Sequence, residues 1–140
     1  MSPKGSRAPA ARAGTQVTTV PVRAATDAPA LARGVATLWA RRAGVAGELM
    51  FDLRLLVSEL VSNAVRHAAE PIELELEASA DRVCVVVRDG GEGFDEFLAV
   101  PSSDDAVGRG LYVVHRLASD WGIERGPPFA VWFELERRAP

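Results

Sequence analysis

The first half of the chain carries two stretches in which apolar residues recur with the period of an α-helix. In the first, four apolar side chains recur at i, i+4, i+7 and i+8: Leu31, Val35, Leu38 and Trp39. Asp27 can cap the start of this helix, Pro29 fits its first turn, and Gly44 and Gly47 mark its end. Residues 48–68 hold a second stripe of the same period: Leu49, Leu53, Leu56, Leu60 and Ala64. Two successive amphipathic helices are therefore predicted.

Strand patterns lie on both sides of these helices. Residues 16–22 are rich in β-branched side chains, and Pro21 favours an edge position for the strand that they form. Residues 72–78 alternate strictly, which predicts a strand whose glutamates face solvent. Residues 81–89 are apolar nearly throughout and suit a central strand. Three further elements are predicted: a helix at 110–118 and strands at 121–125 and 130–137.

The order of these elements predicts an α+β fold. Helices would cover one face of a mixed, mostly antiparallel sheet, forming a two-layer sandwich. The chain of 140 residues is long enough for one domain and too short for two. Residues 1–15 have no periodicity and are predicted to be a disordered basic tail, so the folded domain would span residues 16–140.

Composition and charge exclude several classes of protein. No apolar run reaches the length of a membrane span or a signal-peptide core, so a cytoplasmic protein without membrane contact is expected. Cys84 is the single cysteine, which rules out an internal disulfide. The net charge of the chain is −3. Residues 1–16 contain three bases and no acid and so carry +3, which leaves −6 on the remaining residues. That sign argues against direct binding of nucleic acid.

The second predicted helix contains a polar face that invites a functional explanation. Glu59 and Asn63 are four residues apart and project from the same side of a helix, with Arg66 and His67 about one turn further on. Asn is a poor helix former, and Asn63 interrupts an otherwise apolar segment. On its own, this face could equally be a polar stripe in contact with water.

Two glycine-rich segments follow the predicted central strand. Asp89 stands at the end of that strand, and Gly91 and Gly93 allow a backbone to approach a ligand closely. Gly108 and Gly110 open the next helix, whose free N-terminal amides suit a phosphate group. Each cluster alone could also be a turn or a helix cap.

Taken in order, these three segments resemble the nucleotide site of the GHKL ATPases, the superfamily of gyrase-type and histidine-kinase ATP domains. The resemblance covers roughly residues 16–137. It implies the Bergerat-type ATP-binding fold. The chain is most similar to the single-domain serine/threonine kinases that act as anti-sigma factors.

The resemblance also implies a role for each motif residue. Asn63 would ligate Mg²⁺, Glu59 would act as general base, and Asp89 would accept a hydrogen bond from the adenine amino group. Residues 94–107 would form a lid over the nucleotide. The other residues that would contact ATP lie around these three: Arg66, His67, Gly91, Gly93, Gly108, Arg109, Gly110 and Leu111.

One segment departs from the family pattern. The family often has a Gly-Thr pair before the last strand, with the Thr near the adenine. Here Ala130 stands where that Thr is expected, and Phe129 replaces the glycine. The loss of one hydroxyl would weaken adenine binding by about 1 kcal/mol.

Two functions remain open at this point. The resemblance implies an ATP-dependent kinase that phosphorylates a serine of an anti-anti-sigma protein of STAS type and sequesters a sigma factor. The missing Thr and the short lid favour a catalytically weak, ATP-binding interaction module instead. The sequence names neither the partner nor the sigma factor, and it leaves homodimerisation open.

Overall fold

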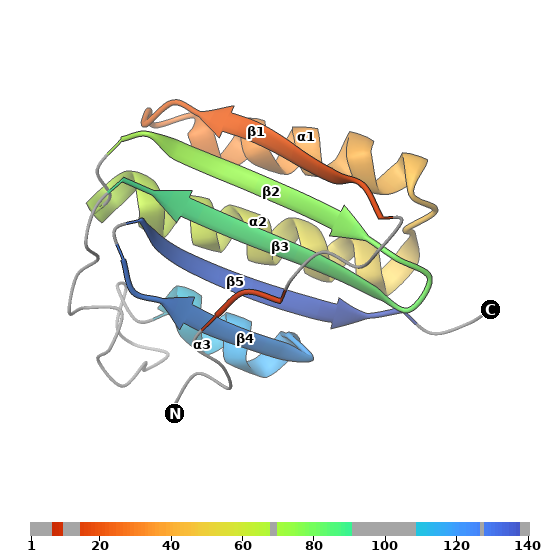
Figure 1. The fold of residues 1–140 in the computed structure, drawn as a ribbon. Helices are drawn as coiled ribbons and strands as arrows, with labels where there is room; N and C mark the ends of the chain where they lie inside the picture. The colour runs from red at the N-terminus through yellow and green to blue at the C-terminus, as the bar shows by residue number, and fades with distance from the viewer. Residues whose placement is uncertain (1–6, 10–14, 68–69, 91–108, 127, 138–140) are drawn as a thin grey trace.

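The structure is a computed structural model of the chain. It describes residues 7–9, 15–67, 70–90, 109–126 and 128–137. Figure 1 shows a single twisted sheet in front of a layer of helices.

Five strands form the sheet, and every pairing between neighbouring strands is antiparallel. Their bounds are β1 Val17–Val22, β2 Ile72–Ala78, β3 Arg82–Asp89, β4 Asp120–Glu124 and β5 Phe129–Glu136. The order across the sheet is β1-β2-β3-β5-β4, so β3 lies at the centre and β1 and β4 form the edges. The edge position of β1 and the central position of β3 agree with the predictions from Pro21 and from the apolar run at 81–89.

Three helices pack against one face of this sheet: α1 Ala28–Arg42, α2 Gly47–His67 and α3 Arg109–Leu117 (Figure 1). The predicted α+β sandwich is confirmed, and the sheet is antiparallel throughout the described residues. Among those residues, none of the helices combines the length and the apolar character that crossing a bilayer would require.

The main core lies between α2 and the sheet. Leu53, Leu56 and Leu60 of α2 are buried against inward-facing side chains of the strands, as the apolar stripe of this helix predicts. Trp121 and Phe133 are among the largest fully buried side chains, which supports a structural role for Trp121.

Of the four residues in the predicted apolar stripe of α1, only Trp39 packs against this core. Leu31 and Leu38 are 63% and 61% exposed, and Val35 is also exposed. The buried face of α1 is made of small residues instead: Ala28, Ala32, Ala36, Thr37 and Ala40. Small side chains let α1 approach α2 closely, so the helix turns its bulkier stripe outward. The helical period was predicted correctly, but it does not reveal which face is buried.

The glutamate row of β2 is another departure from the predictions. Glu73 is exposed, but Glu77 is buried and pairs with Arg82 at 3.3 Å. Glu75 is half-buried and pairs with Arg88. The expectation of a solvated face is therefore wrong for two of the three glutamates, because arginines of β3 lie diagonally across the strand pair, two residues from the positions paired with Glu75 and Glu77.

Candidate functional site

Helix α2 presents the predicted polar face beside the core. Asn63 is 2% exposed, whereas Glu59, one turn earlier, is half-buried. Their neighbours Leu60 and Ala64 pack against β3 and β5, which fixes the rotation of the helix at this point. Asn63 is thus held at the boundary between the apolar core and the polar face.

The carboxamide of Asn63 has only part of its hydrogen-bonding capacity filled. Its Oδ1 accepts a hydrogen bond of 3.3 Å from the exposed guanidinium of Arg66. Its Nδ2 is buried and has no partner among the described residues. A buried donor without a partner costs about 1–3 kcal/mol. Such a cost near the C-terminal end of α2 indicates a functional requirement for this side chain.

Arg66 does not form the structural ion pair that would explain Glu59. The hydrogen bond that the structure gives Arg66 goes to Asn63 and not to the carboxylate of Glu59. Arg66 and Asn63 lie three positions apart on α2, and residues with this spacing are neighbours on one side of a helix. An ion pair with Arg66 therefore does not account for the carboxylate of Glu59.

Asp89 occupies the last position of β3, and its side chain turns toward the helices. It is 6% exposed and lines a small cavity between the sheet and α2. The cavity measures about 10 Å³, and all its other lining side chains are apolar: Leu60, Ala64, Val87, Phe129 and Val131. A carboxylate surrounded by apolar side chains can accept a hydrogen bond from one polar group of a ligand, but a cavity of this size holds only about one water molecule and does not enclose a base.

The register of β5 corrects the position assigned to the missing threonine. Phe129 is paired with Asp89 and lines the same cavity, whereas Ala130 is paired with Arg88 and lies on the opposite face of the sheet. Because side chains alternate along a strand, Ala130 cannot approach an adenine bound beside Asp89. The residue that replaces a hydroxyl at the site is Phe129, and the assignment to Ala130 was wrong.

Gly90 positions Asp89, although the sequence motif did not single it out. A Cβ at Gly90 would lie 3.0 Å from the carbonyl oxygen of Glu70 and 3.0 Å from Cδ of Pro71. Any larger residue would push the end of β3 away from the segment that follows α2. The doubled glycine after Asp89 was the sequence signal for this close approach.

The remaining predicted site residues are only partly covered by the structure. Gly91, Gly93, Gly108 and the lid at 94–107 lie outside the described residues. Three more belong to the first turn of α3, where only the backbone is described: Arg109, Gly110 and Leu111. His67 ends α2, and its side chain is likewise outside the description. Their roles at the nucleotide remain predictions.

The described residues fit a magnesium ion that is shared with a nucleotide. The Oδ1 of Asn63 is the type of oxygen ligand that Mg²⁺ takes, and an exposed arginine that can move away is its present partner. Among the described residues, no group of three His, Cys, Asp or Glu side chains is arranged so that it could hold a metal ion. Most of the ligands would therefore have to come from phosphate and water, which is the usual pattern for Mg²⁺.

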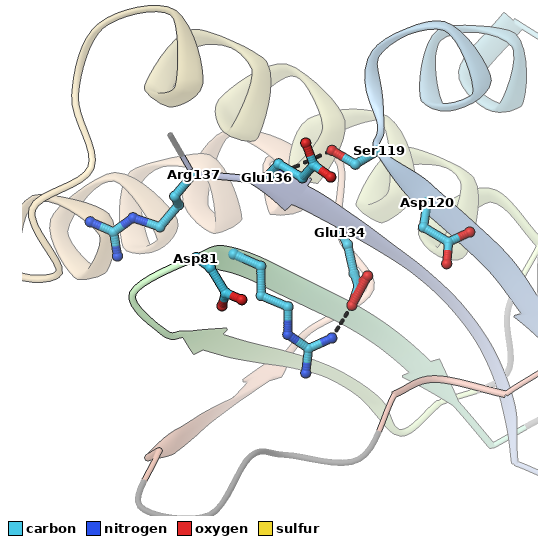
Figure 2. A pocket seen from close by; sticks show the side chains of 7 residues that line it. Asp81, Ser119, Asp120, Glu134, Glu136 and Arg137 are labelled. Atoms are coloured by element: carbon cyan, nitrogen blue, oxygen red, sulfur yellow. Dashed lines mark hydrogen bonds and ion pairs between the residues drawn. The ribbon is translucent and has the colours of Figure 1, made fainter. Parts of the chain in front are cut away.

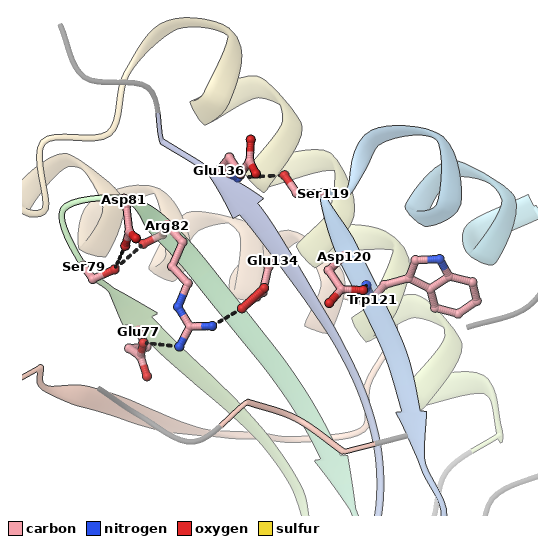
Figure 3. Close-up of polar contacts among 9 residues, drawn as sticks. All are labelled: Glu77, Ser79, Asp81, Arg82, Ser119, Asp120, Trp121, Glu134 and Glu136. Atoms are coloured by element: carbon pink, nitrogen blue, oxygen red, sulfur yellow. Dashed lines mark hydrogen bonds and ion pairs between the residues drawn. The ribbon is translucent and has the colours of Figure 1, made fainter. Parts of the chain in front are cut away.

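A larger cavity lies at the opposite end of β3. It has a volume of about 630 Å³ and is lined by charged and polar side chains: Asp81, Arg82, Ser119, Asp120, Glu134, Glu136 and Arg137 (Figure 2). Figure 3 shows Arg82 between Glu77 and Glu134. These contacts connect three neighbouring strands, and none of the described residues that line the cavity is a predicted nucleotide-site residue.

His115 and Cys84 have structural surroundings. Nε1 of Trp121 donates a hydrogen bond of 3.3 Å to Nδ1 of His115, and the two rings meet edge to face. Burial raises the pKa of the Cys84 thiol to about 11, with Arg82 opposing the shift and nearby glutamates adding to it. A thiol with a raised pKa is a poor nucleophile, so the Cys84 side chain serves as a small buried apolar group.

Comparison with known proteins identifies a family for this chain. Residues 22–131 match the family model of the histidine kinase-like ATPase domain. The matched range runs from the end of β1 into β5 and contains Glu59, Asn63, Asp89 and the start of α3. No curated protein matches the chain.

Proposed function

Since this chain belongs to the histidine kinase-like ATPase family, whose members bind ATP, we propose that it phosphorylates a serine of a partner protein and thereby controls its hold on a sigma factor. The observation that carries the proposal is Asn63, a buried polar side chain with an unpartnered amide on the same helix face as Glu59. The anti-sigma role comes from the resemblance of the motifs. The kinase role also rests on the arrangement of α2.

Asn63 and Asp89 would hold the two ends of the nucleotide. Oδ1 of Asn63 would ligate Mg²⁺, with Arg66 moving toward the phosphates when it leaves that oxygen. Asp89 would accept a hydrogen bond from the adenine amino group at the apolar cavity. When bound, ATP supplies the phosphoryl group for transfer and Mg²⁺ neutralises its charge.

Glu59 would be the general base of the transfer. It lies one helical turn before Asn63 on the same side of α2, and it is half-buried. Its carboxylate would take the proton from the hydroxyl of the partner's serine as that oxygen bonds to the γ-phosphorus of ATP and the bond from this phosphorus to ADP, the leaving group, breaks. The expected cost of its loss is a factor of about a hundred or more in transfer rate.

The exposed stripe of α1 supports a protein as the partner. Leu31, Val35 and Leu38 form an apolar surface on the outside of the helix. Beside it, an apolar groove of about 460 Å³ runs between α1 and β1. Contiguous exposed apolar surface of this kind marks protein-binding sites. An anti-anti-sigma protein, a sigma factor or a second copy of the chain would fit this surface, and we propose the anti-anti-sigma protein as the substrate.

The second candidate is an ATP-binding interaction module with little catalysis. Phe129 is the specific observation that favours it, because this ring occupies the wall beside Asp89 where the family often places a threonine. A bulky ring there would weaken nucleotide binding, and the partner surface of α1 would then carry most of the function.

One set of measurements separates the two candidates. Calorimetry with Mg²⁺ and ATP measures binding by the wild type and by Glu59→Gln. Partners captured on the wild type are then incubated with ATP labelled on the γ-phosphate. The kinase hypothesis expects equal ATP affinity in the two proteins and transfer by the wild type alone. Wild-type binding of ATP without transfer to any captured partner would favour the interaction module.

A further inference from the structure

The face of the sheet that points away from the helices, here named the outer face, has its own apolar centre. Four side chains form it, and all are buried: Cys84, Val86, Ala130 and Trp132. Two strands contribute them, β3 and β5, at positions that alternate with the residues of the main core. Trp132 is only 2% exposed although no described helix covers this face.

Two rows of ion pairs lie on either side of this apolar centre. Arg88 of β3 contacts Glu75 on β2 and Glu124 on β4, the latter at 2.9 Å. The small side chain of Ala130, which is paired with both Arg88 and Glu124, leaves room for this reach across β5. Arg82 makes the second row with Glu77 and Glu134 (Figure 3).

Acidic side chains outnumber these arginines on the outer face. Alternation from the paired register places seven acids there: Glu73, Glu75, Glu77, Asp120, Glu124, Glu134 and Glu136. With Arg82 and Arg88, the described strand residues of this face carry a formal charge of −5. A segment that settles on the outer face should therefore be basic and should carry small apolar side chains.

The N-terminal segment of the chain has that chemistry, and part of it already touches the outer face. Ala8 is half-buried against the apolar centre. Ala8 and Pro9 line a cavity of about 200 Å³ together with Cys84 and Val86. Figure 1 draws residues 7–9 on the side of the sheet away from the helices. Residues 1–16 contain three basic side chains and no acid: Lys4, Arg7 and Arg12.

Trp132 adds a polar requirement to this surface. Its Nε1 is buried and has no hydrogen-bond partner among the described residues. A buried indole N–H normally finds an acceptor, and a backbone carbonyl of an overlying segment can supply one. The indole N–H of Trp132 therefore favours a peptide segment, which has carbonyl acceptors, over a purely apolar group as the cover of this face.

From these contacts we propose that the outer face is a docking surface for the chain's own N-terminal segment, residues 1–16. The small apolar residues of the segment cover Cys84 and Trp132, and its three bases face the acidic rim. Charge complementarity across the contact makes the attachment sensitive to salt. The occupant is thus a basic peptide carried in cis, in place of the freely solvated tail that composition alone suggests.

Cys84 provides a direct probe, because it is the only thiol in the chain and lies under the proposed cover. Its reaction with a soluble disulfide reagent is followed at about pH 8 in the full chain and in a variant that lacks residues 1–14. Burial holds the thiol pKa at about 11, against an ordinary value of 9.0. Uncovering should therefore speed the reaction by roughly tenfold to a hundredfold, through access and through a larger thiolate fraction.

Two full-length variants test the charge argument without removing the segment. Reversing the three bases, Lys4→Glu with Arg7→Glu and Arg12→Glu, should expose Cys84 almost as much as the deletion does. The matched control Lys4→Arg with Arg7→Lys and Arg12→Lys keeps the charge and should keep the protection. A synthetic peptide of residues 1–16, added to the truncated protein, should restore protection.

Other results would overturn the proposal. Equal thiol reactivity in the full, truncated and charge-reversed proteins, with all three folded by circular dichroism, would show that the segment does not cover this face. Protection that grows with protein concentration would assign the cover to a second copy of the chain. Asp89 and Asn63 lie on the helix side of the sheet, so ATP affinity should be the same in all variants. Failure of the docking proposal is therefore distinguishable from failure of the nucleotide site.

Discussion

Replacing Asn63 by leucine should make the ligand-free protein more stable while it removes metal-dependent nucleotide binding. Leucine has the same number and branching of side-chain heavy atoms, so the shape of the buried position is nearly kept. The change removes an Nδ2 donor that is buried without a partner, at a gain of about 1–3 kcal/mol. It also gives up the hydrogen bond of 3.3 Å to Arg66, whose guanidinium is exposed and can return to water. The net expectation is a gain of about 1–2 kcal/mol, which corresponds to a rise of roughly 3–8 °C in Tm.

Thermal unfolding measures both halves of this expectation. Wild type and Asn63→Leu are melted alone, with ATP, and with ATP and Mg²⁺. A ligand at about a hundred times its Kd should stabilise the wild type by about 2.7 kcal/mol, and the Mg²⁺-dependent part should vanish in the variant. Thr37→Val is the matched control, because its buried hydroxyl is satisfied by a hydrogen bond of 2.7 Å to the carbonyl of Arg33. That variant should gain no stability.

Two outcomes would refute the reasoning about Asn63. A loss of 1 kcal/mol or more in Asn63→Leu would mean that the amide is satisfied in the folded protein. An Mg²⁺-dependent shift equal to that of the wild type would reject Asn63 as a metal ligand.

Three further changes test other parts of the molecule. Asp89→Asn should weaken ATP binding by about tenfold or more in calorimetry, because the amide cannot replace a carboxylate as acceptor on both oxygens; unchanged affinity would reject the adenine assignment. Phe129→Thr should cost about 3 kcal/mol of stability in urea titrations, because it opens the cavity beside Asp89. The same variant should tighten ATP binding, because it adds a hydroxyl there. Ala130→Thr, on the opposite face of the sheet, should leave ATP affinity unchanged. Folding raises the pKa of Cys84 from about 9 to about 11. The stability contributed by the buried, protonated thiol is therefore complete below about pH 9 and is lost as the pH rises through about 11. The wild type should therefore lose about 2 kcal/mol more than Cys84→Ala between pH 8 and 11, and equal losses would contradict the burial argument.

Sequence periodicity predicted the elements of this fold well, because each one has a strong local signal. The strict alternation at 72–78 and the apolar run at 81–89 led to β2 and β3 with nearly the observed bounds. The same reasoning could not orient α1, since apolar residues occur on both of its faces. Packing against α2 favours the smaller side chains, and only the assembled structure shows this choice.

Two of the residues that the motifs singled out are now placed in the fold, but their roles at a nucleotide stay predictions. Asn63 and Asp89 stood out as polar groups at unusual places, and the structure buries both. Alignment by motif alone placed the missing hydroxyl at Ala130, an error of one residue that moves a side chain to the other face of the sheet. Strand pairing is set by contacts distant in sequence, so the register could not be read from the segment itself.

Because side chains alternate along β3 and β5, one face of this strand pair contributes to the expected nucleotide site and the other to the proposed docking surface. Val87, Asp89 and Phe129 face α2, where the nucleotide site is expected, whereas Cys84 and Trp132 face away from it. A substitution on one set leaves the chemistry of the other unchanged, so nucleotide binding and docking on the outer face can be altered independently. The thiol reactivity of Cys84 should therefore be the same with and without ATP, and a change on addition of ATP would show that the two faces are coupled through the backbone of β5.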